Sequence, residues 1–113
     1  MNIVRSNDAT RFENAASCVA YEYDTQTSDI NIARIEINGR YPVEGSVVNT
    51  EVTELVYVES GSGLASVEGE THSIQKGDVI SISKEERSSW EGSMTLIIAC
   101  SPAWTPEQHT TVS

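Results

Sequence analysis

Short runs of alternating apolar and polar residues, separated by turns that contain glycine, make up most of this chain. The clearest example is the stretch 54–83, which passes through four such runs and three glycine turns. Alternation with a period of two residues is typical of a strand with one buried face, and short strands at regular spacing predict a sandwich or a barrel. No segment shows the apolar spacing of an amphipathic helix. The sequence therefore predicts an all-β fold.

Strands are expected at residues 16–23, 30–37, 46–49, 54–59, 64–68, 72–74, 79–83 and 94–100. Polar clusters or glycines mark the turns between them, at residues 24–29, 38–39, 61–63, 69–70, 76–78 and 91–92. Proline cannot donate a hydrogen bond to a strand ladder. Two prolines follow residue 101, so residues 101–113 are expected to form a C-terminal tail.

The composition is that of a globular protein, with 21% charged and 38% hydrophobic residues. A length of 113 residues fits a single domain over residues 1–113. The net charge is −10, and the acidic residues are scattered rather than gathered in a block. A negative field repels nucleic acid and anionic lipid, so neither nucleic acid nor a membrane is expected as a partner. The simplest role of this charge is to keep the protein soluble.

The expected location is cytoplasmic. No apolar run approaches the roughly 20 residues that are needed to span a bilayer. The first residues also lack the apolar core of a signal peptide. Cys18 and Cys100 fit no paired motif, so both are expected to be buried free thiols in a reducing compartment.

Glu54 and Gly61 are separated by six residues, and Gly77 follows after a short interval. This pattern resembles the cupin superfamily, whose first motif ends with a glutamate, six residues and a glycine, and whose second motif begins with a glycine. The resemblance covers about residues 34–100. The segment from Cys100 to His109 is also similar to the tail of small cupins that lack the metal-binding histidines. The resemblance implies a cupin-type jelly roll, also called a double-stranded β-helix barrel.

Cupins that bind a metal hold it through three histidines and a glutamate. Counting back from Glu54, the first two histidine positions fall on Val47 and Asn49 or on Val48 and Thr50. Counting forward from Gly77, the third falls on Ser88. A transition metal prefers imidazole, thiolate or several carboxylates, and one glutamate with neutral oxygens is a poor substitute. The whole chain has two histidines, which cannot rebuild a three-histidine site. We therefore expect no metal and no cofactor.

Glu54 and Val56 lie on the same face of their predicted strand. If this face lines the barrel, Glu54 is a carboxylate in an apolar cup, where burial would raise its pKa and suit it to acid–base catalysis or ligand binding. The alternative places Glu54 at a strand end, half solvated. Glu54 is therefore the candidate catalytic residue, and Asn49 and Val56 join it as ligand-binding candidates.

Ser88 and Trp90 share a face of a later strand and complete the ligand-binding set. In the functional interpretation, Trp90 provides a wall for stacking and Ser88 donates a hydrogen bond. The alternative makes Trp90 part of the core, as most tryptophans of small domains are.

Cys100 is either a structural thiol or a nucleophile that His109 activates by folding back. His72, between Thr71 and Ser73, is expected on the surface. Because the activating pair has no motif behind it, the structural interpretation of Cys100 is favoured.

Four further side chains are candidates to meet the cavity or its surroundings: Arg34, Tyr41, Tyr57 and Trp104. Tyr57 alternates with Glu54 and Val56, so it is expected outside the barrel or at a dimer face. Trp104 either plugs the mouth of the barrel or covers a partner subunit.

Three functions remain open. The first is a metal-free barrel that binds a small polar molecule. The second is an enzyme of cupin type (an isomerase, epimerase or dioxygenase) that uses Glu54 or a non-standard metal site. The third is a structural role based on dimerisation. The resemblance also implies a homodimer, because a barrel of this size leaves strand edges that must be paired, covered or charged.

Overall fold

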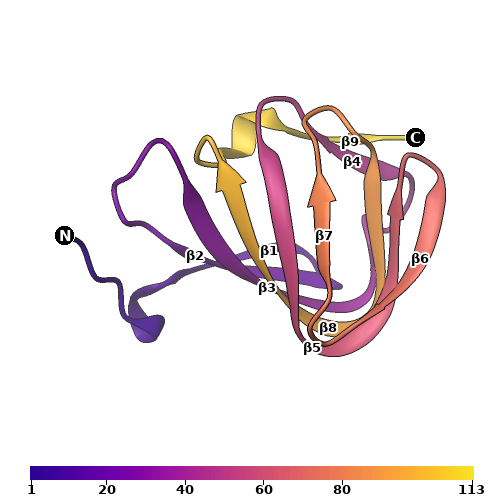
Figure 1. The fold of residues 1–113 in the computed structure, drawn as a ribbon, viewed down its shortest axis with the longest axis horizontal. Helices are drawn as coiled ribbons and strands as arrows, with labels where there is room; N and C mark the ends of the chain where they lie inside the picture. The colour runs from indigo at the N-terminus through magenta and orange to yellow at the C-terminus, as the bar shows by residue number, and fades with distance from the viewer.

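A computed structural model describes all 113 residues and consists almost entirely of strands (Figure 1). The strands are β1 (Thr10–Ala15), β2 (Cys18–Tyr23), β3 (Asn31–Tyr41), β4 (Ser46–Asn49), β5 (Thr53–Val67), β6 (Glu70–Gln75), β7 (Val79–Ile82), β8 (Ser88–Ser101) and β9 (His109–Val112). Two single-turn 3-10 helices, η1 (Ser6–Asp8) and η2 (Pro106–Gln108), are the only helices. The prediction of an all-β fold is confirmed.

The long strand β8 is the centre of the sheet. It pairs antiparallel with β3 along one edge and with β5 along the other. Beyond β3 follow β2 and then β1, while β5 also pairs with β7 and β6. Strand β4 pairs with β9 and contacts β8 at a single position, which brings the C-terminal residues onto the curled sheet. Figure 1 shows how the long strands curve around one hollow side.

Three of the turns predicted from glycine are wrong. Residues 38–39 lie inside β3, residues 61–63 inside β5, and residues 91–92 inside β8. Gly39 is the register partner of Gly92, and Gly92 is the partner of Gly63, so the three glycines form one row across three neighbouring strands. Gly39 and Gly92 have φ values of +117° and +141°. Glycine adopts such angles without steric cost, so each strand bends and continues instead of ending in a turn.

The bend at this glycine row is required by the shape of the hollow. Asn31 and Tyr41 are the first and last residues of β3. In a straight strand they would lie about 33 Å apart. Both nevertheless line one cavity, and so do Ser88 and Cys100 from the two ends of β8. The two ends of β3 therefore lie close to each other, and so do the two ends of β8, which requires both strands to bend strongly.

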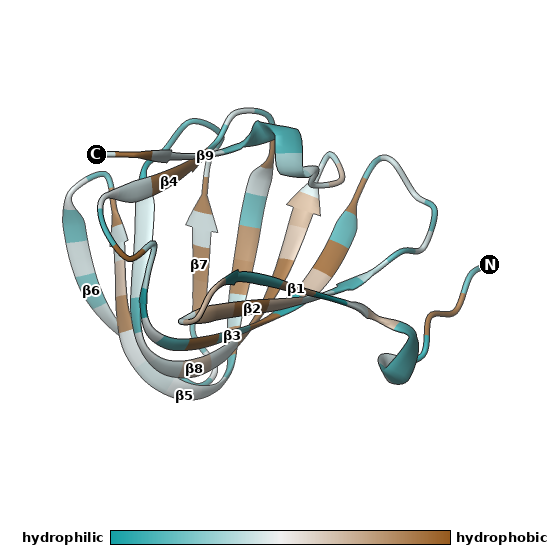
Figure 2. Ribbon diagram, turned by 180° about the vertical axis from the view of Figure 1, so that it is seen from behind, coloured by the Kyte–Doolittle hydropathy of each residue, from teal (hydrophilic) through white to brown (hydrophobic).

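The core lies on the concave side of the sheet. Val56, Val58 and Leu96 are completely buried there and pack against a larger apolar cluster that includes Ile37 and Trp90. Figure 2 shows that apolar residues lie mainly on the strands, while β1 and most loops are hydrophilic. A hydrophilic edge strand such as β1 discourages uncontrolled pairing with other chains. None of the helices could cross a membrane, since each is too short.

The glycine row gives a prediction about stability. A β-carbon on Gly92 would lie 2.6 Å from the α-carbon of Gly63 and 2.6 Å from the carbonyl oxygen of Ser62. We expect Gly92→Ala to lower the free energy of unfolding by more than about 2 kcal/mol, because overpacking adds to backbone strain. Chemical denaturation measures this loss.

Gly69→Ala is the matched control. Gly69 also has a positive φ, of +81°, but a β-carbon there would meet no atom within 4 Å. We expect this variant to cost about 1 kcal/mol, the price of the left-handed backbone alone. Equal losses in the two variants would show that close approach of the strands at the row is unimportant.

Candidate functional site

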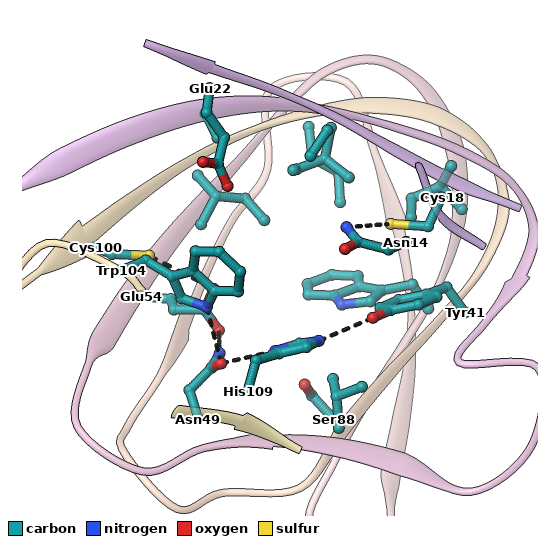
Figure 3. Close-up of a pocket in the computed structure, with 18 of the residues that line it drawn as sticks. Asn14, Cys18, Glu22, Tyr41, Asn49, Glu54, Ser88, Cys100, Trp104 and His109 are labelled. Carbon is teal, nitrogen blue, oxygen red and sulfur yellow. Dashed lines mark hydrogen bonds between the residues drawn. The ribbon is translucent and has the colours of Figure 1, made fainter. Parts of the chain in front are cut away.

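One cavity opens on the concave side of the sheet, at the end where the C-terminal segment packs (Figure 3). Its volume is about 80 Å³, measured as the space open to the centre of a water molecule. One wall is apolar and comes from inward-facing residues of β2, β3 and β8: Cys18, Ala20, Ala33, Ile35, Ile37, Leu96 and Ile98. Polar and aromatic side chains from β4, β5, the end of β8 and the C-terminal segment gather opposite this wall. The cavity thus has the form of a small-molecule site, apolar with a few convergent polar groups.

Asn49, the last residue of β4, contacts three other side chains that line the cavity. Its amide nitrogen donates a hydrogen bond to Glu54 Oε1 at 3.0 Å. Its oxygen accepts one from Trp104 Nε1 at 3.0 Å and lies 2.8 Å from His109 Nδ1. Asn49 is 8% exposed, so these contacts satisfy an amide that would otherwise be buried at a cost. One neutral side chain therefore links the acidic and the aromatic parts of the site.

Glu54 lies near the start of β5 and faces the cavity. The Cys100 thiol donates a weak hydrogen bond to Glu54 Oε2 at 3.7 Å, so both carboxyl oxygens have a donor. Burial raises the pKa of Glu54, and the bonds from Asn49 and Cys100 offset part of that rise. A carboxyl group with a raised pKa next to a cavity is suited to proton transfer.

Cys100 itself is held as a thiol. Burial raises its pKa, and the neighbouring carboxylates of Glu54 and Glu22 raise it further. The nucleophilic form of cysteine is the thiolate, so this environment opposes a role in covalent catalysis. The hydrogen bond between Cys100 and His109 that such a role requires is not formed, because both ring nitrogens of His109 have other partners, Asn49 and Tyr41.

His109 lies between Asn49 and Tyr41. Its Nε2 is 2.8 Å from the Tyr41 hydroxyl, and the two rings are parallel within 3°. Burial lowers the pKa of His109 and raises the pKa of Tyr41 to about 12. Both effects favour the uncharged form of each side chain.

The C-terminal segment is fixed in place by contacts that are far apart in sequence. Strand β9 pairs with β4, and the buried Gln108 accepts hydrogen bonds from the backbone of Glu51 and Val52. Asn31 exchanges two hydrogen bonds with the backbone of Trp104. The tail therefore supplies Trp104 and His109 to the lining of the cavity.

Four of the five ligand-binding candidates line the cavity: Asn49, Glu54, Ser88 and Trp90. The fifth, Val56, does not line it. Val56 lies two residues deeper on β5 and is completely buried against the core. Tyr57 lies outside and His72 is exposed, as expected.

The prediction that Arg34 could meet the cavity is wrong. Arg34 lies on the outer face of β3, where it pairs with Glu36 at 2.8 Å and covers the ring of Tyr21. Side chains alternate between the two faces of β3. Ala33 and Ile35 line the cavity, so Arg34 between them points to the outer face.

Sequence reasoning missed three polar lining residues: Asn14, Glu22 and Asn31. Glu22 carried a usable signal, because it alternates with Cys18 and Ala20 on the same face of β2. Burial also raises the pKa of Glu22. The sequence suggests His109 only as a partner for Cys100, because its contacts with Tyr41 and Asn49 join residues more than 50 positions apart.

The side chains at the cavity do not fit the metal that the cupin fold implies. Two pairs of residues could correspond to the first two histidines of the motif, and the pair that lines the cavity is Val47 and Asn49. Ser88, at the position of the third histidine, lines the cavity too. No three His, Cys, Asp or Glu side chains come together in a group that could hold an ion. The Asn49 amide also directs an N–H group at Glu54, which opposes a cation at that carboxylate. This donor set is unsuited to a divalent transition metal.

Comparison with known proteins gives matches among solved structures. No protein-family model matches the sequence, and no curated protein matches it either. The structure of Streptomyces PAC13 with uridine superimposes with a TM-score of 0.88 at 19% identity, over 98% of this chain and 90% of that chain. PAC13 is described as a nucleoside dehydratase.

Two other matches cover most of both chains. KdgF from Halomonas has a TM-score of 0.72 at 15% identity, over 95% of this chain and 97% of that chain. An RmlC-like cupin from Shewanella frigidimarina has a TM-score of 0.71 at 15% identity, over 88% of each chain. At these identities the likeness concerns the fold, and it agrees with the spacing of Glu54, Gly61 and Gly77. The curled sheet of this chain is therefore a cupin barrel, and the chain has the fold of the cupin superfamily.

Proposed function

We propose that the cavity binds a small uncharged polar molecule, with a nucleoside as the leading class, and that it does so without a metal. The observation that carries this proposal is the charge of the lining. None of the 19 lining residues is a lysine or an arginine, and two of them, Glu22 and Glu54, are acidic. An anionic ligand would find no counter-charge there, and its desolvation would be uncompensated.

The other lining groups suit a ring that carries hydroxyl groups. Trp90 and Trp104 offer aromatic surfaces at the cavity, and the apolar wall of β2, β3 and β8 can cover one face of a ligand. Ser88 and Asn14 add groups that can donate or accept hydrogen bonds. The uridine complex of the similarly folded PAC13 makes uridine the natural first probe.

Isothermal titration calorimetry with uridine and with uridine monophosphate tests the proposal. We expect uridine to bind and its phosphate to bind at least about tenfold more weakly, a difference of roughly 1.4 kcal/mol. Ser88→Ala should weaken uridine binding, whereas Ser66→Ala, at a half-buried serine of the β5–β6 hairpin that does not line the cavity, should leave it unchanged. Tighter binding of the phosphate would contradict the proposal, and so would an absence of binding by both compounds.

An enzyme is the second candidate, and the raised pKa of Glu54 favours it. A carboxyl group whose pKa is raised by burial can take a proton from one ligand atom and return it to another. Eliminations such as dehydration need these two transfers, and PAC13 is a dehydratase of this fold. In such an enzyme, Glu54→Gln should abolish turnover while ligand affinity is retained. No turnover on uridine and related nucleosides would favour the binding protein.

The burial of Glu54 also predicts how stability depends on pH. Burial raises the folded-state pKa of Glu54 above its usual value of 4.5, so holding the ionised form costs stability. The stabilisation that comes with the neutral carboxyl is present below pH 4.5 and is lost as the pH rises through the raised pKa. We therefore expect Glu54→Gln to become progressively more stable than the natural protein as the pH rises above 4.5.

Denaturant titrations at several pH values measure this difference. Glu59→Gln, at an exposed position of the same strand, is the control for loss of a negative charge from an acidic protein. A stability difference for Glu54→Gln that is the same at all pH values would mean that Glu54 is solvated rather than buried.

We also infer a homodimer that buries the outer face of the sheet. Four large apolar residues are between 44% and 62% exposed on this face: Ile32, Leu55, Tyr57 and Val79. Pairing registers make the patch continuous across β3, β8, β5 and β7, through Ala99 and Ile97 of β8. A monomer rarely exposes such a surface. The adjoining ion pair of Arg34 and Glu36 offers both signs of charge, which a second copy related by a two-fold axis would complement.

Light scattering tests the dimer. Leu55→Lys should shift the protein to a monomer, because two copies of the new charge would meet in an apolar interface. Val43→Lys is the control, since Val43 is 69% exposed in the loop after β3 and lies outside the patch. A monomeric natural protein, or equal effects of the two variants, would remove this face as an interface.

The proposed location is the cytoplasm. Cys18 and Cys100 are both buried and free, which suits a reducing compartment.

A further inference from the structure

His109 is held at both ring nitrogens, and the identity of its partners fixes where the hydrogens lie. The indole Nε1 of Trp104 can only donate a hydrogen bond. The Asn49 atom 3.0 Å from it must therefore be the amide oxygen, which leaves the amide nitrogen facing Glu54. The same oxygen lies 2.8 Å from His109 Nδ1. Since this oxygen can only accept, Nδ1 carries a hydrogen.

The other ring nitrogen then follows. In the neutral imidazole only one nitrogen carries hydrogen, so Nε2 has a free lone pair. Tyr41 lies 2.8 Å away and must donate its hydroxyl hydrogen to Nε2. The hydroxyl oxygen of Tyr41 retains its own lone pairs, and Tyr41 lines the cavity.

We propose that Tyr41 and His109 form a proton relay at the cavity, and that Asn49 positions it. The relay rests on the proposed function, because it requires a ligand in the cavity, and it adds a second proton-transfer group to the one at Glu54. Tyr41 is the member that contacts the ligand. His109 acts through Tyr41, and Asn49 acts through His109.

The step balances without any further reactant. A proton leaves an oxygen or carbon atom of the ligand and joins the hydroxyl oxygen of Tyr41, while the original hydroxyl proton of Tyr41 moves to His109 Nε2. The electron pair of the broken bond stays on the ligand, and nothing is oxidised or reduced. His109 becomes an imidazolium whose Nδ1–H is held by Asn49, and the reverse movement returns the proton to a leaving hydroxyl or to the ligand.

The groups around His109 determine the charge of the resting ring. Tyr41 of β3, Asn49 of β4 and Trp104 contact the ring. The other titratable groups that line the cavity are Glu54 on β5, Cys100 on β8, and Glu22 and Cys18 on β2. No fixed positive charge lies among them, so burial keeps the resting ring neutral and able to accept. Glu54, bonded to the same amide, would then offset the positive charge of the imidazolium.

The test is heteronuclear NMR of the histidine ring nitrogens in the full chain without ligand. The chain has two histidines, and the exposed His72 serves as the internal reference. We expect His109 to show the Nδ1–H tautomer at neutral pH, with an Nε2 signal typical of a hydrogen-bond acceptor. In Tyr41→Phe that Nε2 signal should move to the position of a free acceptor. An Nε2–H tautomer, or an imidazolium at neutral pH, would overturn the relay.

Asn49→Asp tests the positioning role separately. A carboxylate facing Nδ1 should raise the pKa of His109, and an unchanged pKa would show that residue 49 does not orient the ring. If either variant fails to fold, the tautomer of the natural protein still decides the proposal. This measurement uses the free protein, so the wrong tautomer counts against the relay, whereas failure to bind uridine counts against the proposed ligand.

Discussion

Three neighbouring strands of this barrel can bend together because each has a glycine at the same position across the sheet. At Gly92 the backbones of β5 and β8 approach so closely that a β-carbon would meet the α-carbon of Gly63. The bend folds the Tyr41 end of β3 over its Asn31 end, and the Ser88 end of β8 over its Cys100 end. Without it, the residues of the cavity would lie along straight strands and could not meet. The site therefore depends on glycine, which has no side chain, at all three positions of the row.

Within the bent sheet, the positions that the cupin resemblance assigns to metal ligands hold a different kind of group. Asn49 stands at one histidine position and Ser88 at another, and an amide now makes the contacts at the centre of the site. An amide can donate and accept at once, so it can join a carboxylate to an indole and an imidazole, whereas a bound cation would attract the carboxylate and repel the imidazolium. The same architecture thus supports a hydrogen-bonded site in place of a coordination site.

The sequence predicts the facing of strand residues well, because alternation is a local property of the extended backbone. Glu54, Ser88 and Trp90 line the cavity for this reason, and Glu22 could have been found in the same way, whereas Asn49 follows from the motif spacing. Glycine is less informative: it permits a bend as readily as a turn, and nothing near residues 38–39 or 91–92 distinguishes the two. The role of the C-terminal segment is still harder to foresee. His109 reaches Tyr41 and Asn49 only through the pairing of β9 with β4, and no local pattern encodes a contact over that separation.

The shared amide also affects what any titration of this site will report. Glu54 and His109 bind opposite ends of one Asn49 side chain, so a change of charge on either is felt by the other. Where two such groups interact by more than about one pK unit, they lose their protons in macroscopic steps that belong to the pair. With coupling of that size, a bell-shaped profile from this cavity would describe one acid–base unit rather than two independent groups.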